Sequence, residues 1–502
     1  MKLDQLLKSI DVINNSEVAS IDIEGVAYHS QMVSDNYMFV CVKGREVDGH
    51  SFISDAEKRG AKVAVVEDLQ DGVNIPQIVV KDTRQALAQI GSNFYHQPSK
   101  HLKMIGITAT NGKTSTSYMT NAIFENAGLK TGLIGTVTVK IDDHSISSKL
   151  TTPESLDLQY YLNQMVEKNV SHVSMEVSSA ALEMQRVNTV HYDIVALNNV
   201  SREHIDTHGS FERYFEVKSS LIRDADEESF AVLNLDNPYA ASLVDQTKAK
   251  VITFGIENKD GHIHCKGIDL TTGRATFKVE ILKPFKTSIK KFQPSTFDIA
   301  LDVPGLHSVY NAMVAITIAL LSDIPITTIQ RTLKEFLGVP RRFEFIYEDE
   351  IKIVDDHFAN PGNINVTLGT LQQMAYNNLH IVYAIRGSRG VVINRENAEA
   401  VVEHASKLGL HQITATKSVS HVTAQDEVTD KELEVFLDVM EQANINVTVF
   451  DELPNAIHHA LADTAKDDLV LLAGCQGMDY GAGIALGQLY KENVADNKGT
   501  IQ

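Results

Sequence analysis

The sequence has no tryptophan, three cysteines and no apolar run that approaches the roughly 20 residues needed to span a bilayer. Its cysteines, Cys41, Cys265 and Cys475, are far apart and odd in number, which argues against a disulfide framework and a clustered metal site. They fit a reducing cytosol. The N-terminal stretch is amphipathic, carries acids and lacks the apolar core of a signal peptide. We therefore predict a cytoplasmic protein without membrane insertion.

Positive charge is also scarce, because 45 lysines and arginines face 65 aspartates and glutamates, for a net charge of −20. An extended nucleic-acid surface is unexpected on such a chain, so no nucleic-acid partner is predicted. An anionic substrate would have to be held by local lysines, arginines, helix ends and metal. The composition, 43% hydrophobic and 22% charged, is that of an ordinary globular protein.

The length of 502 residues suggests three domains at on the order of 150 residues each. The pattern predicts an α/β fold with a mixed domain over 1–98, a central domain over 99–336 and a C-terminal domain over 337–502. Helices and strands alternate in the central domain, including one strand over 131–139, and residues 261–304 read as a small antiparallel insertion. The C-terminal domain is predicted to be doubly wound and Rossmann-like, with a loose polar tail from Lys491.

A nucleoside triphosphate site is predicted at residues 104–116 (MIGITATNGKTST). An apolar strand ends in a polar turn, and Lys113 and Thr114 then open a helix that Gly128 stops. Turn N–H groups and the helix N-terminus suit phosphates, a lysine neutralises them, and a threonine hydroxyl suits Mg²⁺. The strict phosphate-loop pattern fails at Ile107, where a glycine is expected, so a chance surface turn is the alternative reading.

Three further polar groups follow apolar strands or lie on a nearby helix. Glu176 ends the strand 172–177, where it needs either a metal or a salt bridge. His204 lies in a polar loop and could ligate a divalent ion, although a solvated histidine fits the same position. Lys218 lies on an amphipathic helix, where a plain surface lysine is the simpler reading.

Two more stretches could contact phosphate or sugar. Residues 151–154 (TTPE) form a turn before a helix, which suits a phosphate or a sugar but equally a helix cap. Residues 341–344 (RRFE) and 356–361 (DHFANP) lie at the second domain boundary and after a strand. They could reach phosphates and ribose hydroxyls, or form an ordinary ion pair and a turn.

Taken together and in order, these motifs resemble the Mur ligase family, most closely its UDP-N-acetylmuramoyl-tripeptide synthetase branch. The resemblance covers about residues 25–365 and implies a three-domain architecture with a central P-loop ATPase domain. It is carried by 44–50, 108–114, 151–153, 176–179, 203–209 with Lys218, 234–238, 305–311, 342–344 and 356–361.

The resemblance implies a role for each matching residue. ATP would be bound by Thr110, Asn111, Gly112, Lys113, Thr114, Ser115, Asn311, Arg342 and Asp356. Mg²⁺ would be bound by Thr114, Glu176, His204 and Lys218, the last as a carbamate, and Lys113, Glu176, His204 and Lys218 would form the catalytic set. The UDP-muramoyl substrate would contact Ser30, Thr151, Thr152, Ser178 and Arg186.

The implied reaction joins an amino acid or other amine to a UDP-muramoyl-peptide. The γ-phosphate activates a carboxylate as an acyl phosphate, an amine attacks, and phosphate leaves, in peptidoglycan precursor synthesis. A monomer is expected. Two alternatives stay open: a ligase of this architecture for another carboxylate, such as a folate or a polyamide, and a non-catalytic Mur-like binding protein.

Several positions depart from the family pattern. In the first two domains Ala109 replaces a phosphate-loop glycine, Ala180 a histidine and His307 an asparagine. An alanine at 109 requires a negative φ there. Beyond residue 380, Arg386–Gly390, Thr414–Ser418 and Gly474–Asp479 stand where the family has its amine-recognition motifs. The amine is therefore left open, and diaminopimelate is disfavoured.

Overall fold

The computed structural model describes residues 1–14, 21–44, 47–202 and 208–499, with the side chains of 491–499 left out. The chain divides into two units, each considered by itself. One comprises Met1–His264, Ile281–Ser295 and Met313–Ile329, and the other comprises Cys265–Glu280, Thr296–Ala312 and the chain from Gln330 onward. Among the described residues, no helix has both the length and the apolar composition that crossing a bilayer requires.

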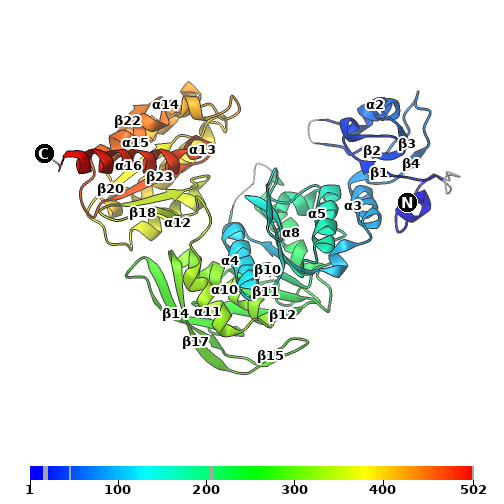
Figure 1. Ribbon diagram of the computed structural model, residues 1–502, viewed down its shortest axis with the longest axis horizontal. Coiled ribbons are helices and arrows are strands. Elements are labelled where there is room, and N and C mark those ends of the chain that lie inside the picture. The colour runs from blue at the N-terminus through cyan, green and yellow to red at the C-terminus, as the bar shows by residue number, and fades with distance from the viewer. Residues whose placement is uncertain (15–20, 45–46, 203–207, 500–502) are drawn as a thin grey trace. The chain divides into compact units, whose positions relative to one another are not determined.

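The N-terminal part of the first unit is a parallel sheet with helices on both faces (Figure 1). Its elements are α1 (Leu3–Leu6), β1 (Gly25–Ala27), η1 (Ser30–Met32), β2 (Tyr37–Val40), η2 (Gly49–Phe52), α2 (Ile53–Lys58), β3 (Ala61–Val66), β4 (Gln77–Val79) and α3 (Thr83–Phe94). Alternate residues of a strand point to opposite faces. Met38 and Val63 accordingly pack with α1 and α3, whereas Phe39 and Ala64 pack with α2.

A central sheet forms the core of the same unit. Its elements are η3 (Pro98–His101), β5 (Lys103–Thr108), α4 (Lys113–Asn126), β6 (Thr131–Ile134), β7 (Thr138–Ile141), β8 (His144–Ser147), α5 (Ser155–Glu167), β9 (His172–Glu176), α6 (Ser179–Glu183), β10 (Ile194–Leu197), α8 (Phe211–Arg223), β11 (Phe230–Asn234), α9 (Pro238–Ala241) and β12 (Lys250–Gly255). Strands β12, β11, β10, β5, β9 and β6 are parallel neighbours in that order. The carboxyl ends of β5 and β9 therefore lie side by side, which places the phosphate loop beside Glu176.

Helices α5 and α8 cover one face of this sheet. Leu158 and Leu162 of α5 and Ile222 of α8 are fully buried in one apolar cluster with Met175 and Val195 of the strands. Ser210 caps the N-terminus of α8, its hydroxyl accepting from the N–H of Arg213. This packing fixes α8 against the sheet, and Lys218 with it.

The segment after β12, predicted to be a small antiparallel insertion over 261–304, extends the central sheet. Its elements, with the helices that follow, are β13 (Ile263–Asp269), β14 (Arg274–Ile281), β15 (Phe285–Lys286), β16 (Lys291–Phe292), β17 (Ser295–Pro304), α10 (Leu306–Leu321) and α11 (Ile326–Glu335). The strand order continues from β12 through β13 and β14 to β17, and β15 and β16 form an antiparallel pair.

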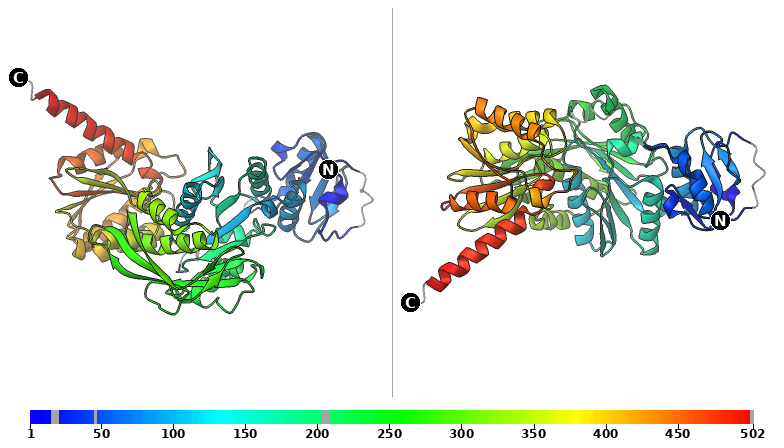
Figure 2. Two further views of the ribbon diagram at one scale, coloured as in Figure 1. Left: turned by 60° about the horizontal axis from the view of Figure 1, so that its bottom comes forward. Right: turned by 90° about the horizontal axis from the view of Figure 1, so that it is seen from above.

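The C-terminal part of the second unit is a separate, doubly wound sheet (Figure 2). Its elements are β18 (Glu344–Glu348), β19 (Lys352–Asp356), α12 (Pro361–Leu371), β20 (Leu379–Ala384), α13 (Val391–Leu408), β21 (Gln412–Thr416), η4 (Val419–His421), α14 (Asp430–Gln442), β22 (Asn446–Phe450), α15 (Leu453–Ala462), β23 (Leu469–Gly474), η5 (Gln476–Met478) and α16 (Gly481–Gly499). The order is β18-β19-β23-β20-β21-β22, parallel apart from β18. Val354 and Leu471 pack with α12, α13 and α14, and Ile353 and Leu472 pack with α15 and α16.

Two predictions about elements are wrong. The strand over 131–139 is interrupted by a tight turn, in which the N–H of Gly135 donates to Thr138 O at 3.0 Å. Strands β6 and β7 pair antiparallel on either side of this turn. The tail from Lys491 is helical rather than loose, since α16 continues to Gly499.

Candidate active site

The phosphate loop connects β5 to α4 as predicted. Gly112 has φ 92°, the left-handed conformation that favours glycine, whereas Ala109 does not occur among the described non-glycine residues with positive φ. The condition for an alanine at 109 is therefore met. Lys113 Nζ donates to Ala109 O at 2.9 Å and to Thr110 O at 3.1 Å, so its ammonium group folds back over the loop.

The loop is held from β10 by Asn199, which follows that strand. The N–H of Thr110 donates to Asn199 O at 2.9 Å, and the N–H of Asn111 donates to Asn199 Oδ1 at 3.0 Å. Asn199 Nδ2 returns a hydrogen bond to Asn111 O at 2.9 Å. Side chain and backbone of one residue thus fix the middle of the loop. Ser115, also predicted to contact ATP, lies half-buried in the first turn of α4.

Glu176 ends β9 and is completely buried. Its Oε2 accepts from Thr114 Oγ1 at 3.0 Å and from Thr136 Oγ1 at 3.0 Å, and its Oε1 accepts from Thr136 N at 2.9 Å. Burial raises the pKa of Glu176 above its usual value, while the Thr136 N–H and the charge of Lys113 act in the opposite direction. The structure therefore brings Thr114 and Glu176 together, as the metal-site prediction requires.

The turn that interrupts β6 and β7 supplies two residues that the sequence analysis missed. Thr136 contacts both carboxylate oxygens of Glu176, because its N–H donates to Oε1 and its hydroxyl donates to Oε2. At Gly135, an added Cβ would lie 2.2 Å from Glu176 Oε1, so no side chain fits there. The Gly-Thr pair after a buried strand was visible in the sequence, but its partner is 40 residues away.

Lys218 reaches the phosphate loop from α8 and is 1% exposed, so the reading as a surface lysine is wrong. Its Nζ donates to Ala109 O at 2.9 Å and to Thr108 Oγ1 at 3.2 Å. The same nitrogen lies 5.1 Å from the ring centroid of Tyr214, whose hydroxyl is 3.0 Å from Thr110 Oγ1. Lys113 and Lys218 thus share one backbone acceptor, Ala109 O.

His204 lies outside the described residues. Within those that are described, no three His, Cys, Asp or Glu side chains gather as a metal site. Nearby His208 is buried, with Nε2 3.0 Å from Ser179 Oγ and Nδ1 3.1 Å from Glu183 Oε2. His208 therefore joins the start of α8 to α6, just beyond the Glu176 strand.

Four of the five residues predicted to contact the UDP-muramoyl substrate, all except Ser30, form one cluster in the first unit. Thr152 is buried, and its hydroxyl donates to Glu176 O at 2.9 Å and accepts from Ser178 N at 3.1 Å. Arg186 Nη1 donates to Thr152 O at 3.2 Å, and Nη2 pairs with Glu154 Oε1 at 2.6 Å. Thr151 Oγ1 lies 3.1 Å from Thr136 Oγ1. The cluster is continuous with the Glu176 site through the backbone of β9.

Ser30 and Asn311 lie in other elements. Ser30 is buried at the start of η1 in the N-terminal sheet. Two hydrogen bonds, the stronger effect coming from the Ser30 side chain and the weaker from Arg59, hold the pKa of Asp55 below its usual value. Asn311 is buried on α10, in the second unit.

Arg342 and Asp356 belong to the second unit. Asp356 is 6% exposed and ends β19; its Oδ1 accepts from Phe343 N at 2.8 Å and its Oδ2 from the Thr367 hydroxyl. Burial raises its pKa above the usual value, which these hydrogen bonds oppose. Arg342 Nη1 makes a long contact of 3.4 Å to Arg341 O. The carboxylate of Asp356 is thus used to hold the turn that carries Arg342.

The divergent motifs of the C-terminal sheet have internal partners. Arg341 Nη2 donates to Gly474 O at 2.6 Å, Nη1 donates to Cys475 O at 3.1 Å, and the guanidinium also pairs with Asp479. Ser418 Oγ, in the segment 414–418, donates to Gly477 O at 2.7 Å. These contacts tie the carboxyl ends of β21 and β23 together.

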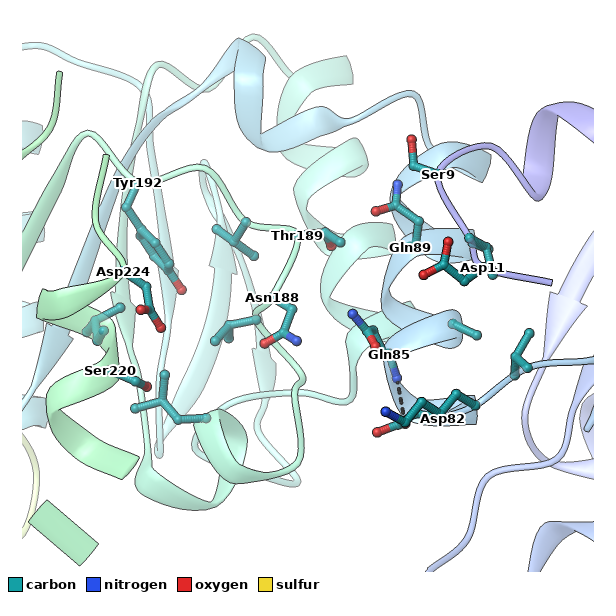
Figure 3. Close-up of a pocket in the computed structure, with 18 of the residues that line it drawn as sticks. Ser9, Asp11, Asp82, Gln85, Gln89, Asn188, Thr189, Tyr192, Ser220 and Asp224 are labelled. Carbon is teal, nitrogen blue, oxygen red and sulfur yellow. Dashed lines mark hydrogen bonds between the residues drawn. The ribbon is translucent and has the colours of Figure 1, made fainter. Parts of the chain in front are cut away.

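A pocket of ≈650 Å³ lies elsewhere in the first unit (Figure 3). Gln85, Gln89 and Asp82 line it from α3 and its cap, and Tyr192 and Asp224 line it from the central part. None of the predicted site residues that the structure describes lines this pocket. It is therefore separate from the cluster around Glu176.

Models of one family match most of the chain. The model described as "Mur ligase family, catalytic domain" matches residues 22–95, "Mur ligase middle domain" matches 107–319, and "Mur ligase, glutamate ligase domain" matches 341–476. Together they confirm the three-domain α/β architecture that the sequence predicts.

Curated relatives span nearly the whole chain. The proteins named UDP-N-acetylmuramoyl-L-alanyl-D-glutamate–2,6-diaminopimelate ligase from Caldanaerobacter subterraneus and Bacillus licheniformis are each 33% identical to it. The matches extend over 481 and 485 residues and cover 94% of this chain and 94% of each relative.

Solved structures share the fold. A structure titled as a ligase of the same name has a TM-score of 0.69 at 21% identity, covering 94% of this chain and 93% of its own. A UDP-N-acetylmuramoylalanyl-D-glutamyl-2,6-diaminopimelate–D-alanyl-D-alanyl ligase from Acinetobacter baumannii has a TM-score of 0.66 at 20% identity, covering 97% and 98%. From the family models and the curated relatives, the chain belongs to the Mur ligase family.

Proposed function

We propose that this chain is an ATP-dependent ligase that adds an amino acid to a UDP-N-acetylmuramoyl-peptide in peptidoglycan precursor synthesis. The observation that carries the proposal is the convergence of Lys113, Thr114, Glu176 and Lys218 on one phosphate loop. Curated relatives at 33% identity over 94% of the chain carry this activity in their names. Family membership supports the use of ATP.

The proposed reaction has two steps, a phosphoryl transfer and an acyl transfer, and neither changes an oxidation state. A carboxylate oxygen of the UDP-muramoyl-peptide attacks the γ-phosphorus, the bond to the β–γ bridging oxygen breaks, and ADP leaves. The amine nitrogen then attacks the acyl carbon, loses a proton and expels phosphate. Lys113 would exchange its two carbonyl acceptors for β- and γ-phosphate oxygens, neutralising charge that develops between two anions.

The residues at the loop fit a magnesium ion. Thr114 and Glu176 offer oxygen donors, which Mg²⁺ prefers, and the carboxylate is buried next to a helix N-terminus. Because Gly135 has no Cβ, the Glu176 carboxylate can occupy this position without a steric clash. When bound, the ion would neutralise phosphate oxygens and polarise the γ-phosphoryl group. His204 is proposed as a further ligand.

Lys218 is proposed to act as a carbamate, an anionic metal ligand. Its Nζ and that of Lys113 both lie 2.9 Å from Ala109 O, so two ammonium groups would face one carbonyl. Conversion of Lys218 to a carbamate would replace their repulsion by attraction. Its burial beside the loop supports this role.

The substrate and nucleotide contacts follow the same resemblance. Thr110, Asn111, Gly112 and Ser115 would bind the phosphates with Lys113. We propose that Ser30, Thr151, Thr152, Ser178 and Arg186 contact the UDP-muramoyl-peptide, and that Asn311, Arg342 and Asp356 contact the nucleotide. The relatives' names specify 2,6-diaminopimelate, but this chain departs from the family at 414–418 and 474–479, so the amine has to be identified by experiment.

The direct test is turnover with purified protein. ATP and Mg²⁺ are combined with UDP-N-acetylmuramoyl-L-alanyl-D-glutamate and, separately, diaminopimelate, lysine and other amino acids, with phosphate release and product mass as readouts. We expect one amine to give a product heavier by that amine minus water. Absence of turnover with every pair, despite ATP binding, would contradict the proposal.

Lys113→Ala provides the first residue-specific check. Because the ammonium group would contact the transferred phosphate, we expect turnover to fall by about a hundred- to a thousandfold, the loss typical of removing one charge-stabilising group. Lys130→Ala is the matched control, since Lys130 is exposed and pairs with Asp142. Persistent turnover in Lys113→Ala would show that the phosphate loop is wrongly assigned.

Lys218→Ala tests the carbamate. Turnover should be lost, and added bicarbonate should not restore it, because alanine has no amine to react. The mass of intact wild-type protein at raised bicarbonate and alkaline pH offers a second readout. Full activity of the variant would refute the role.

A further inference from the structure

A row of hydrogen bonds links the phosphate loop to the proposed UDP-substrate contacts. Glu176 Oε2 lies 3.0 Å from Thr114 Oγ1 and 3.0 Å from Thr136 Oγ1. Thr136 Oγ1 in turn lies 3.1 Å from Thr151 Oγ1. Its two ends, Thr114 and Thr151, have proposed roles in different ligand sites. Thr136, which lies between Glu176 and Thr151, has no proposed role so far.

Hydrogen-bonding capacity sets the direction of this row. An ionised carboxylate only accepts, and a threonine hydroxyl has one proton to donate. When Glu176 is ionised, the single proton of Thr136 is therefore committed to Glu176 Oε2. The contact between Thr151 and Thr136 then requires Thr151 to be the donor.

We propose that Thr136 is a positioning residue that couples binding of the UDP-muramoyl-peptide to binding of Mg²⁺ and ATP. This inference rests on the proposed function, because it uses the roles assigned there to Thr114, Glu176 and Thr151. Thr136 is exposed, so a ligand can reach it, and its backbone N–H also holds Glu176 Oε1. Both carboxylate oxygens thus depend on this one residue.

The coupling has a definite sign. A hydroxyl that accepts a hydrogen bond is a stronger donor, because neighbouring hydrogen bonds polarise each other. If the UDP-muramoyl-peptide takes the proton of Thr151, Thr136 donates more weakly to Glu176. Glu176 Oε2 is then more available to a cation, so each ligand tightens the other, and by linkage the two factors are equal.

The test measures binding rather than turnover. Calorimetric titration gives the Kd of the β,γ-imido analogue of ATP with Mg²⁺, in the absence and presence of saturating UDP-N-acetylmuramoyl-L-alanyl-D-glutamate. The reverse titration must give the same ratio. For wild type we expect a ratio of about fivefold or more, the lower end of typical couplings between sites.

Four variants separate the hydroxyl from the fold. Thr136→Val keeps the size and the N–H but removes the hydroxyl, and should bring the ratio to within about twofold of one. Thr136→Ser should restore the wild-type ratio. Thr151→Val should act like Thr136→Val. Thr138→Val is the matched control, since its hydroxyl donates to Ile146 O on the neighbouring strand and should leave the ratio unchanged.

The outcomes distinguish the inference from the proposed function. If wild type binds neither probe, the proposed function is wrong and the inference goes with it. If wild type binds both, the function stands, and the inference is overturned either by a ratio near one or by a Thr136→Val ratio equal to wild type. Thermal melting of the ligand-free variants shows whether a change in ratio comes from lost folding. If Thr136→Val is unfolded, Thr151→Val replaces it, and a wild-type ratio in Thr151→Val then overturns the inference.

Discussion

Gly135 is the residue whose missing side chain shapes the site. A Cβ there would lie 2.2 Å from Glu176 Oε1, and the carboxylate is too deeply buried to move freely. We expect Gly135→Ala to displace Glu176, to lower the free energy of unfolding by about 1–3 kcal/mol and to weaken Mg²⁺-dependent ATP binding more than tenfold.

The control for Gly135→Ala is Gly487→Ala on α16, where an added Cβ meets open space. Calorimetric titration with the β,γ-imido analogue and thermal melting compare the two variants with wild type. If Gly135→Ala binds the analogue with the same dependence on Mg²⁺ as wild type, the proposal that Glu176 holds the metal is contradicted.

Asp355, next to the proposed nucleotide contact, gives a pH-dependent prediction. Burial raises its pKa from 3.8 to about 7, although the charge of Arg341 acts in the opposite direction, and its Oδ2 has no hydrogen-bond partner among the described residues. Between these values the folded protein holds a proton that the unfolded chain has released. The free energy of unfolding therefore falls as the pH rises from about 4 to about 7, and this contribution is constant above that range.

Asp355→Asn removes this titration. Relative to wild type, the variant should gain stability between pH 4 and 7, by on the order of 4 kcal/mol, the equivalent of a change from 3.8 to about 7. Scanning calorimetry from pH 4.5 to 7.5 measures the difference, with Asp438→Asn on the exposed face of α14 as control. A difference that does not change with pH would show that Asp355 is ionised throughout.

At the same scale, the sequence predicts the residues whose chemistry is unusual for their neighbours. Glu176 is a charge in an apolar strand, and Lys113 and Thr114 open a helix after a strand, so local pattern suffices. Thr136 is an ordinary threonine in a polar turn, and its importance depends on a contact 40 residues away. No local pattern reports such a contact.

Among the elements, the loop before α13 and the start of α14 are joined by a single carboxylate. Glu432 Oε1 accepts from the N–H groups of Arg389 and Gly390 at 2.8 and 2.7 Å, and Oε2 accepts from those of Ser388 and Thr429 at 3.1 and 2.9 Å. With the Thr429 hydroxyl this forms a capping box, extended to a second helix.

Glu432→Ala should therefore cost more stability than Thr429→Ala. Loss of the threonine cap typically costs about 1 kcal/mol, whereas loss of the carboxylate leaves the N–H groups of Ser388, Arg389 and Gly390 without their acceptor, at about 1–3 kcal/mol more. Thermal melting ranks the two variants, and limited proteolysis at Arg389 reports opening of the loop. Equal losses would mean that water replaces the carboxylate.

Element boundaries show where sequence patterns succeed and fail. The buried parallel strand β23 is a continuous apolar run, and this pattern is what predicts a doubly wound C-terminal domain. The predicted strand over 131–139 fails because Gly135 and Thr136 fit an extended pattern while their hydrogen bonds form a turn. The helix at Lys491 was missed because its polar sequence lacks an apolar stripe.

On the scale of the whole molecule, the C-terminal sheet has apolar cores of its own. Both clusters that cover its two faces consist of residues between Phe343 and Leu489. We therefore expect a fragment of residues 338–502 to fold by itself, with a cooperative thermal transition and native-like near-ultraviolet circular dichroism.

The fragment would lose the bidentate, partly buried ion pair between Arg274 and Glu348 and the contact of Arg274 with the Phe345 ring. The full-length protein with the Arg274→Ala substitution serves as the control for that loss. A fragment that binds hydrophobic dye and melts without a cooperative transition would show that this sheet depends on the rest of the chain.

The acceptor shared by Lys113 and Lys218 is a backbone carbonyl, at Ala109. Every residue type has that oxygen, so the identity of residue 109 is restricted only by the size of its side chain. The side chain of Ala109 is fully buried, which leaves space for a small one alone. The chain can thus drift between glycine and alanine there while its two lysines stay fixed. In a saturation library screened for turnover, position 109 should accept only the smallest residues, and positions 113 and 218 should accept none but lysine.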